Sequence, residues 1–158
     1  MAAPSPEPPG LATSPAQVAS GLRVERLSQA ERTALALEIL IAYARARRQL
    51  RRAPIAEVVG ALRSLPARRV AAEGDEALLH ARRLGRAVTR LLGLLPGDTR
   101  CLVRSLVLTR LLARRGIPAK LVIGARAAPE FLAHAWVEYA GDPVLDVGDG
   151  SFGRLVEL

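Results

Sequence analysis

The sequence predicts an α+β fold in which several helices come first and a small antiparallel sheet follows. Up to residue 116, apolar residues recur at helical spacing, whereas beyond residue 118 the apolar segments are short and separated by Gly and Pro. With 158 residues, of which 50% are hydrophobic, the chain is long enough to bury the core of one domain. We therefore expect a single domain over residues 26–158, with a helical part over 28–95 and a second part over 96–158.

The first 25 residues differ from the rest because they are rich in Pro, Ala and Ser. They lack the basic start and the apolar stretch of a signal peptide, so we interpret residues 1–25 as a flexible N-terminal extension. No apolar run approaches the roughly 18–20 residues that a membrane span requires. Together with the single cysteine, these observations predict a soluble cytoplasmic protein without a membrane span.

The first helix is predicted to run from Ser28 to about Gln49. Ser28 and Glu31 have the spacing of a capping box, in which each side chain accepts a hydrogen bond from a backbone amide at the helix start. The apolar residues that share one face of this helix are Leu37, Leu40, Ile41 and Ala44. Its C-terminal end is favoured by a basic cluster, Arg45, Arg47 and Arg48, because the helix dipole is negative there.

Two further helices are expected before residue 95. A short one over residues 54–65 is bounded by prolines, which fit the first turn of a helix and cannot continue its interior. A longer one over residues 75–93 should have Asp75 as its cap. Its apolar residues are Leu78, Leu79, Val88, Leu91 and Leu92. We interpret His80, which lies in this helix, as a surface residue.

The fourth helix is expected to be the buried centre of the fold. The turn over residues 96–99 ends in Asp98 and Thr99, which are both good N-cap residues. The residues that follow are apolar nearly all round the helix, as in a helix surrounded by other elements. They are Leu102, Val103, Leu106, Val107, Leu108, Leu111 and Leu112. Gly116 suits the left-handed position just beyond the helix end.

Beyond Gly116 the sequence predicts strands. Residues 119–124 and 131–139 are the first two candidates, and 143–147 is the third. Residues 155–158 are a candidate edge strand. Between the second and third strands we expect Gly141 and Asp142 to form the turn.

Cys101 is the only cysteine and lies at the start of the predicted central helix. One cysteine cannot form an internal disulfide, and with only two histidines in the chain it makes a poor zinc site. In the first turn of a helix, unpaired amides and the positive end of the dipole favour a thiolate and can stabilise an oxyanion. The alternative is that Cys101 is a small apolar residue at a helix start.

A cysteine nucleophile also needs a base and an acid. His134 lies downstream of Cys101 and, by strand alternation, shares a face with Trp136 and Glu138. The two alanines that flank His134 leave room for another element, such as the Cys101 helix. The alternative is a buried structural histidine.

Asp146 is the best candidate for the acid, because it alone among the nearby aspartates lies in an apolar strand candidate. Asp142 and Asp149 are alternatives of the same chemical type. A two-residue turn at 141–142 would set Asp146 opposite Val137, on the wrong face. For Asp146 to lie opposite His134, the hairpin must centre near residue 140, with a loop of about five residues or a bulge.

The chain is strongly basic, with a net charge of +8, and only Lys120 among its 23 basic residues is a lysine. A positive field attracts acidic peptides, nucleic acids or anionic membrane surfaces. Aromatic residues make up only 3% of the chain, which leaves few platforms for stacking bases. We therefore expect no nucleic-acid partner and interpret most arginines as solvated helix faces.

Five blocks between residues 100 and 147 follow one another without large gaps. They are Cys101-Leu-Val-Arg104-Ser105-Leu, Leu111-Leu-Ala-Arg-Arg-Gly116-Ile-Pro, Leu121-Val-Ile-Gly124, His134-Ala-Trp-Val-Glu138 and Asp146. With these blocks the chain resembles the transglutaminase-like leader peptidases of lasso-peptide biosynthesis. Residues 28–95 are similar to that family only in their general character.

The resemblance implies a transglutaminase-like or papain-like core in which Cys101, His134 and Asp146 form a catalytic triad. It implies a cysteine peptidase that removes the leader from a ribosomally made precursor peptide and needs no metal or other cofactor. Such a stand-alone peptidase works with a separate leader-recognition protein and a lasso cyclase. Arg104 and Ser105 belong to the motif and are expected to shape the cleft or bind peptide, and Trp136 is expected in the core or the cleft wall.

Two other interpretations stay open. A transglutaminase-like acyltransferase would use the same triad but pass the acyl group to an amine instead of water. A non-enzymatic scaffold would bind peptide or organise the cyclase without chemistry of its own.

Overall fold

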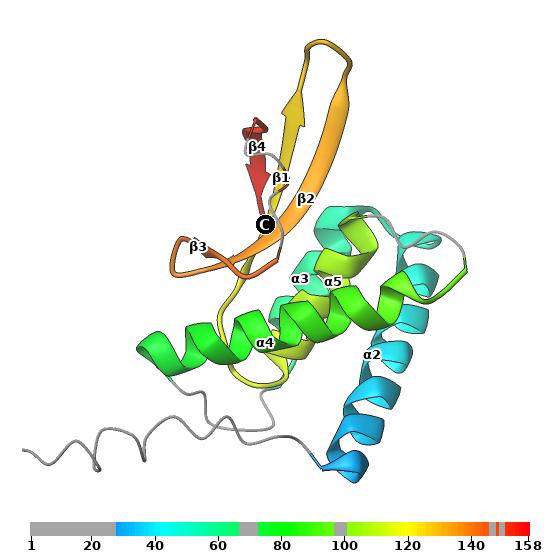
Figure 1. The fold of residues 1–158 in the computed structure, drawn as a ribbon. Coiled ribbons are helices and arrows are strands. Elements are labelled where there is room, and N and C mark those ends of the chain that lie inside the picture. The colour runs from blue at the N-terminus through cyan, green and yellow to red at the C-terminus, as the bar shows by residue number, and fades with distance from the viewer. Residues whose placement is uncertain (1–27, 67–72, 97–100, 146–147, 149–150) are drawn as a thin grey trace, which may run out of the picture.

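Four helices and four strands make up the computed structural model, which describes residues 28–66, 73–96, 101–145, 148 and 151–158. The expected extension over 1–25 lies outside these residues. The helices are α2 (Gln29–Leu50), α3 (Ile55–Arg63), α4 (Gly74–Gly93) and α5 (Cys101–Ala113), and the strands are β1 (Lys120–Arg126), β2 (Leu132–Tyr139), β3 (Asp142–Pro143) and β4 (Gly153–Glu157). The helices gather on one side of the sheet, and the β1–β2 hairpin extends beyond them (Figure 1). The predicted α+β fold is therefore confirmed.

Helix α5 is the centre of the core, as the sequence predicts. It contacts α2, α3, α4, β1 and β2, and most of its side chains are buried. Just past its end Gly116 has a φ of +72°, and the amide of Ile117 donates to the carbonyl of Leu112 at 3.0 Å. Because neighbours surround α5, its first residue, Cys101, is held on a rigid support. The predicted caps Asp98 and Thr99 lie outside the described residues.

Helix α2 begins as predicted but packs through a different face. The capping box is present: the Glu31 amide donates to Ser28 Oγ at 3.2 Å, and the Ser28 amide donates to Glu31 Oε2 at 2.8 Å. However, the residues that face the core are Ile39, Ala42 and Ala46, whereas the predicted face is exposed, with Leu37 58% and Ile41 42% accessible. The small alanine side chains let α2 approach its neighbours closely along a narrow stripe. This close packing determines which face of α2 is buried.

The middle helices differ from prediction at their ends. Helix α3 ends at Arg63, before the expected residue 65. In α4 the N-cap is Glu73, and Asp75 lies inside the first turn, where its charge still favours the helix dipole. His80 is exposed, as expected. None of the described helices is long and apolar enough to cross a membrane.

The sheet is antiparallel in the order β3-β2-β1-β4. In its central pair, Gly124 lies opposite His134 and Val122 opposite Trp136. The face that carries Ala135 and Val137 packs into the core with α5. Strand β4 is an edge strand, as predicted, but starts at Gly153 rather than 155.

The turn between β2 and β3 lies one residue earlier than predicted. Ala140 and Gly141 both have positive φ, 52° and 88°, which is the pattern of a two-residue type I′ hairpin turn. Asp142 therefore pairs with Tyr139 instead of occupying the turn. The backbone twist of a type I′ turn matches the twist of the flanking strands, which favours it in a two-residue hairpin. Such a turn needs two residues with positive φ, and Gly141 adopts the second of these without strain.

Strand β3 is also much shorter than the predicted 143–147, because the chain leaves the sheet towards α4. The last hydrogen bond of the hairpin is donated by the Val144 amide to the Val137 carbonyl at 2.9 Å. Val144 and Leu145 are buried, and a β-carbon on Gly85 of α4 would collide with the Val144 carbonyl. A glycine at position 85 thus lets this segment pack directly on α4. Asp146 lies outside the described residues.

Candidate active site

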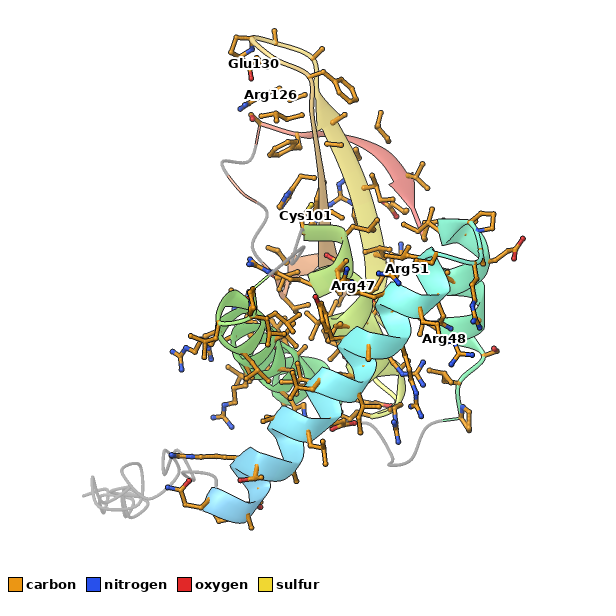
Figure 2. The ribbon with its side chains drawn as sticks, turned by 90° about the vertical axis from the view of Figure 1, so that its right-hand side faces the viewer. Arg47, Arg48, Arg51, Cys101, Arg126 and Glu130 are labelled. Atoms are coloured by element: carbon orange, nitrogen blue, oxygen red, sulfur yellow. The ribbon has the colours of Figure 1, made fainter. Side chains whose placement is uncertain are left out.

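Cys101 is the first residue of α5 and is half-buried. Figure 2 shows it at the end of the helix that lies against the sheet. A thiol in this position is next to the unpaired amides of the first helical turn. Cys101 as a whole residue keeps some solvent exposure.

Ser105 joins the Cys101 end of α5 to the strand that carries His134. The Ser105 side chain is completely buried, and its hydroxyl donates to the carbonyl of Ala135 at 2.9 Å. Cys101 lies one helical turn before Ser105, about 6 Å along the helix axis, and His134 directly precedes Ala135. Helix α5 and strand β2 run in broadly the same direction (Figure 1), so the step from Ser105 to Cys101 leads towards His134.

This contact bears on the role of Ser105. Its fully buried hydroxyl already donates to the backbone and so positions α5 against β2. Ala135 is the flanking alanine that α5 approaches, whereas Ala133 is exposed. Arg104, the other motif residue on α5, is half-buried.

The His134 imidazole lies among aromatic rings on the opposite face of the sheet from Ala135. Its ring is stacked on Trp136 with centroids 6.1 Å apart and planes 19° apart, and it lies 5.1 Å from the Phe152 ring. Trp136 is 2% exposed and forms a buried surface beside the histidine. These rings restrict the imidazole on two sides and hold its orientation.

The Nε2 atom of His134 faces the segment that contains the candidate acids. A β-carbon at Gly148 would lie 4.0 Å from Nε2, and Gly148 stands between Asp146 and Asp149 in the sequence. Both aspartates lie outside the described residues.

The third candidate, Asp142, is placed elsewhere. Its carboxylate is paired with Arg82 of α4 at 3.4 Å. It lies beside Tyr139, about 16 Å along β2 from His134. Asp142 is therefore too far from the imidazole to orient it.

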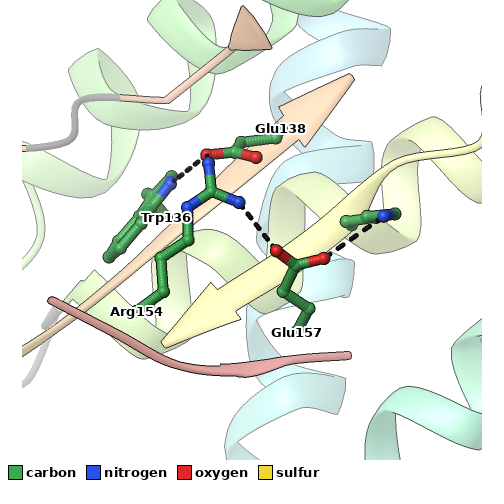
Figure 3. Close-up of polar contacts among 5 residues, drawn as sticks. Trp136, Glu138, Arg154 and Glu157 are labelled. Carbon is green, nitrogen blue, oxygen red and sulfur yellow. Dashed lines mark hydrogen bonds and ion pairs between the residues drawn. The ribbon is translucent and has the colours of Figure 1, made fainter. Parts of the chain in front are cut away.

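A polar network continues from Trp136 along the same face of the sheet (Figure 3). The Trp136 indole and Arg154 both donate to Glu138 Oε1 at 2.7 Å, and Arg154 also donates to Glu157 at 2.7 Å. Lys120 completes the network with a bond of 3.2 Å to Glu157. Glu138 is 5% exposed, so its charge is balanced by these donors rather than by water.

The network sets the charge state of its outer members. The Arg154 hydrogen bond, followed by that of Lys120, lowers the pKa of Glu157, and the pKa of Arg154 is raised chiefly by the same bond to Glu157. The alternation of side chains along the strand predicts from the sequence that Glu138 lies on the same face of the sheet as His134. The partnership with Arg154 could not be foreseen, because it depends on how β4 returns beside β1.

Phe152 and Arg126 were also missed by sequence reasoning. The Arg126 guanidinium lies 5.6 Å from the Phe152 ring and donates to Ser151 Oγ at 2.9 Å. These contacts hold Phe152 against His134. No group of His, Cys, Asp or Glu that could hold a metal ion is found among the described residues.

The fold and the site define an α+β protein with a cysteine at the start of its central helix and a histidine on the strand next to it. The sequence profile of the transglutaminase-like superfamily matches residues 34–157, so the chain belongs to this superfamily. The superfamily includes cysteine peptidases and acyltransferases, and its members are typically enzymes. Searches of curated proteins and of solved structures give no significant match.

Proposed function

We propose that the protein is a cysteine peptidase that removes the leader from a lasso-peptide precursor. Cys101 is the nucleophile, His134 the base and Asp146 the acid that orients it. Three observations support this proposal: the superfamily includes cysteine peptidases, the blocks over residues 100–147 resemble leader peptidases, and the Ser105 contact joins the helix of Cys101 to the strand of His134. The Ser105 contact is the observation that carries the proposal, because a nucleophile and its base must lie close together.

The edge of β2 gives the two groups a route to each other. Among the described residues, β2 pairs with β3 only at Glu138 and Tyr139, and the Val137 carbonyl accepts from the Val144 amide. The next carbonyl along this edge, that of Ala135, is bound by Ser105. The thiol reaches the imidazole around this edge. Since Nε2 faces Gly148, an acid from that segment accepts a hydrogen bond from Nε2, and Nδ1 takes the thiol proton.

The reaction then has two halves. The Cys101 thiolate attacks the carbonyl at the leader–core junction while its backbone amide donates to the oxyanion, and protonated His134 gives its proton to the departing core amine. The C–N bond breaks and a thioester remains. His134 next removes a proton from water, the hydroxide attacks the thioester, and the leader leaves as a carboxylic acid. The thiolate is released for the next cycle.

The proposal extends to partners. A separate leader-recognition protein delivers the precursor, and a lasso cyclase closes the new N-terminus onto an acidic side chain with ATP. The peptidase step itself needs no metal or other cofactor, because thiolate, imidazole and amide supply all its proton and charge transfers.

Mass spectrometry of precursor incubated with the protein, with and without the recognition protein, tests the chemistry. We expect leader release to be lost in Cys101→Ala and His134→Ala and strongly reduced in Asp146→Asn. Asp142→Asn is the matched control and should keep its rate. Asp149→Asn shows which acid is used: a larger loss than in Asp146→Asn would transfer the role to Asp149.

The same experiment separates the rival functions. A product that carries an added amine would identify an acyltransferase. Equal cleavage by Cys101→Ala would rule out the thiol mechanism. Because Cys101 is the only thiol, the rate of alkylation by iodoacetamide reports on it alone, and an active site predicts fast labelling near neutral pH that slows in His134→Ala.

A further inference from the structure

An arginine-rich cavity lies between α2, α3 and α5, on a part of the molecule that the proposed chemistry does not use. It has a volume of about 520 Å³ and is lined by Arg45, Arg48, Gln49, Arg52, Ala53, Glu57, Val58, Ala61 and Arg110. Figure 2 shows Arg48 extending from α2 on the side away from Cys101. Arg110 lies nine residues after Cys101 on α5, about 13 Å along the helix axis.

Among the described residues, the arginines that line this cavity outnumber its carboxylates. There are four of them, against Glu57 alone. Within the part of the chain that the structure describes, none of the four guanidiniums forms an ion pair. By contrast, Arg115 nearby is paired with Glu38 at 2.7 Å. The cavity therefore concentrates donors that an anion can use.

The surroundings of Arg110 agree with this interpretation. Its side chain is half-buried, and the pKa of its guanidinium is lowered by burial first and then by the charges of Arg45 and Arg114. A bound anion would offset both effects. Ala53, Val58 and Ala61 also line the cavity and give part of it an apolar surface.

The spacing of the arginines indicates the shape of the anion. Arg45, Arg48 and Arg52 follow one another at i, i+3 and i+7, so they form a row of about 10 Å along one side of α2. An anion with several charged groups along its length can pair with all three at once. No aromatic residue among those the structure describes lines the cavity, so these residues offer no stacking surface for a base.

We propose that this cavity binds an acidic peptide segment with several carboxylates in a row. In an extended peptide, alternate side chains lie on one face about 7 Å apart, so two or three Glu or Asp side chains span the arginine row. Guanidiniums recognise carboxylates through paired hydrogen bonds. This interaction does not depend on the peptidase proposal, because the cavity and Cys101 lie in different parts of the fold.

Fluorescence anisotropy with a labelled peptide of alternating Glu and Ser tests the site. The triple variant R45Q/R48Q/R52Q should bind this peptide about tenfold more weakly or worse than the unmodified protein. Glutamine is a good helix former, so α2 should stay intact. The matched control is R83Q/R86Q/R90Q, which removes the same charge from exposed positions on α4 and should keep its affinity.

Three further results would support or overturn the proposed peptide site. The charge-reversed variant R45E/R48E/R52E should gain affinity for a peptide of alternating Lys and Ser. Equal losses in the α2 and α4 triple variants would overturn the proposal, since binding would then reflect net charge alone. Tighter binding of single-stranded DNA or of phosphatidylglycerol vesicles than of the acidic peptide, lost in the α2 triple variant, would assign the cavity to nucleic acid or membrane instead.

Discussion

At the scale of single residues, Gly124 determines whether the wall behind His134 can form. A β-carbon at this position would lie 2.9 Å from two ring atoms of Trp136 and 2.8 Å from the Gly153 carbonyl. Trp136 in turn stacks on the histidine. The glycine is needed here for space, because the indole lies directly on the β1 backbone.

We therefore expect Gly124→Ala to lower the free energy of unfolding by about 1–3 kcal/mol, because the indole or β4 must move. Chemical denaturation measures this. Gly60→Ala is the control: a β-carbon there meets nothing within 4 Å, and the change should raise the stability of α3 by about 0.5–1 kcal/mol. Equal effects at the two sites would contradict the packing role of Gly124.

At the scale of elements, the site depends on the contact between α5 and β2. Ser105→Ala removes a buried hydrogen bond and leaves the Ala135 carbonyl without this donor. The free energy of unfolding should fall by about 1–3 kcal/mol, and the alkylation rate of Cys101 should change because its helix loses a fixed position. Ser64→Ala removes an exposed hydroxyl, at the C-cap of α3, that donates to the nearby Ala61 carbonyl, and should change stability by less than about 0.5 kcal/mol.

The elements themselves were largely predictable. The capping box of α2, the glycine beyond α5 and the alternation of β2 are local patterns, in which residues a few positions apart interact. The face of α2 was not predictable, since Leu37 and Ile39 are both apolar and only the shape of α5 selects between them. The hairpin turn was missed because Ala140 accepts a positive φ that its residue type does not favour.

At the scale of the whole molecule, the free energy of unfolding should depend on pH in the acidic range, because two carboxylates have lowered pKa values. Glu31 is held by hydrogen bonds from Ser28, and Glu157 by Arg154 and then Lys120. A carboxylate whose pKa is lower in the folded state stabilises the protein above its unfolded pKa, and this contribution disappears as the pH falls through the folded pKa.

Urea unfolding between pH 7 and acidic pH measures this effect. The stability of the unmodified protein should fall on acidification below about pH 4.5. Glu31→Gln and Glu157→Gln should be less stable than the unmodified protein at pH 7, and the difference should shrink as the pH is lowered. A difference that stays constant would show that the two carboxylates do not carry the pH dependence.

The sequence by itself determined the α+β fold, the buried Cys101 helix and the strand that places His134, Trp136 and Glu138 on one face. These features depend on periodicity and on hydrogen bonds between near neighbours in the chain. The tertiary structure alone decided that Ser105 joins α5 to β2, that Asp142 is held by Arg82 away from His134, and that four arginines share one cavity. Each of these depends on which distant segments meet, and that is settled by the fit of side chains across element surfaces, as at Gly85 and Gly124.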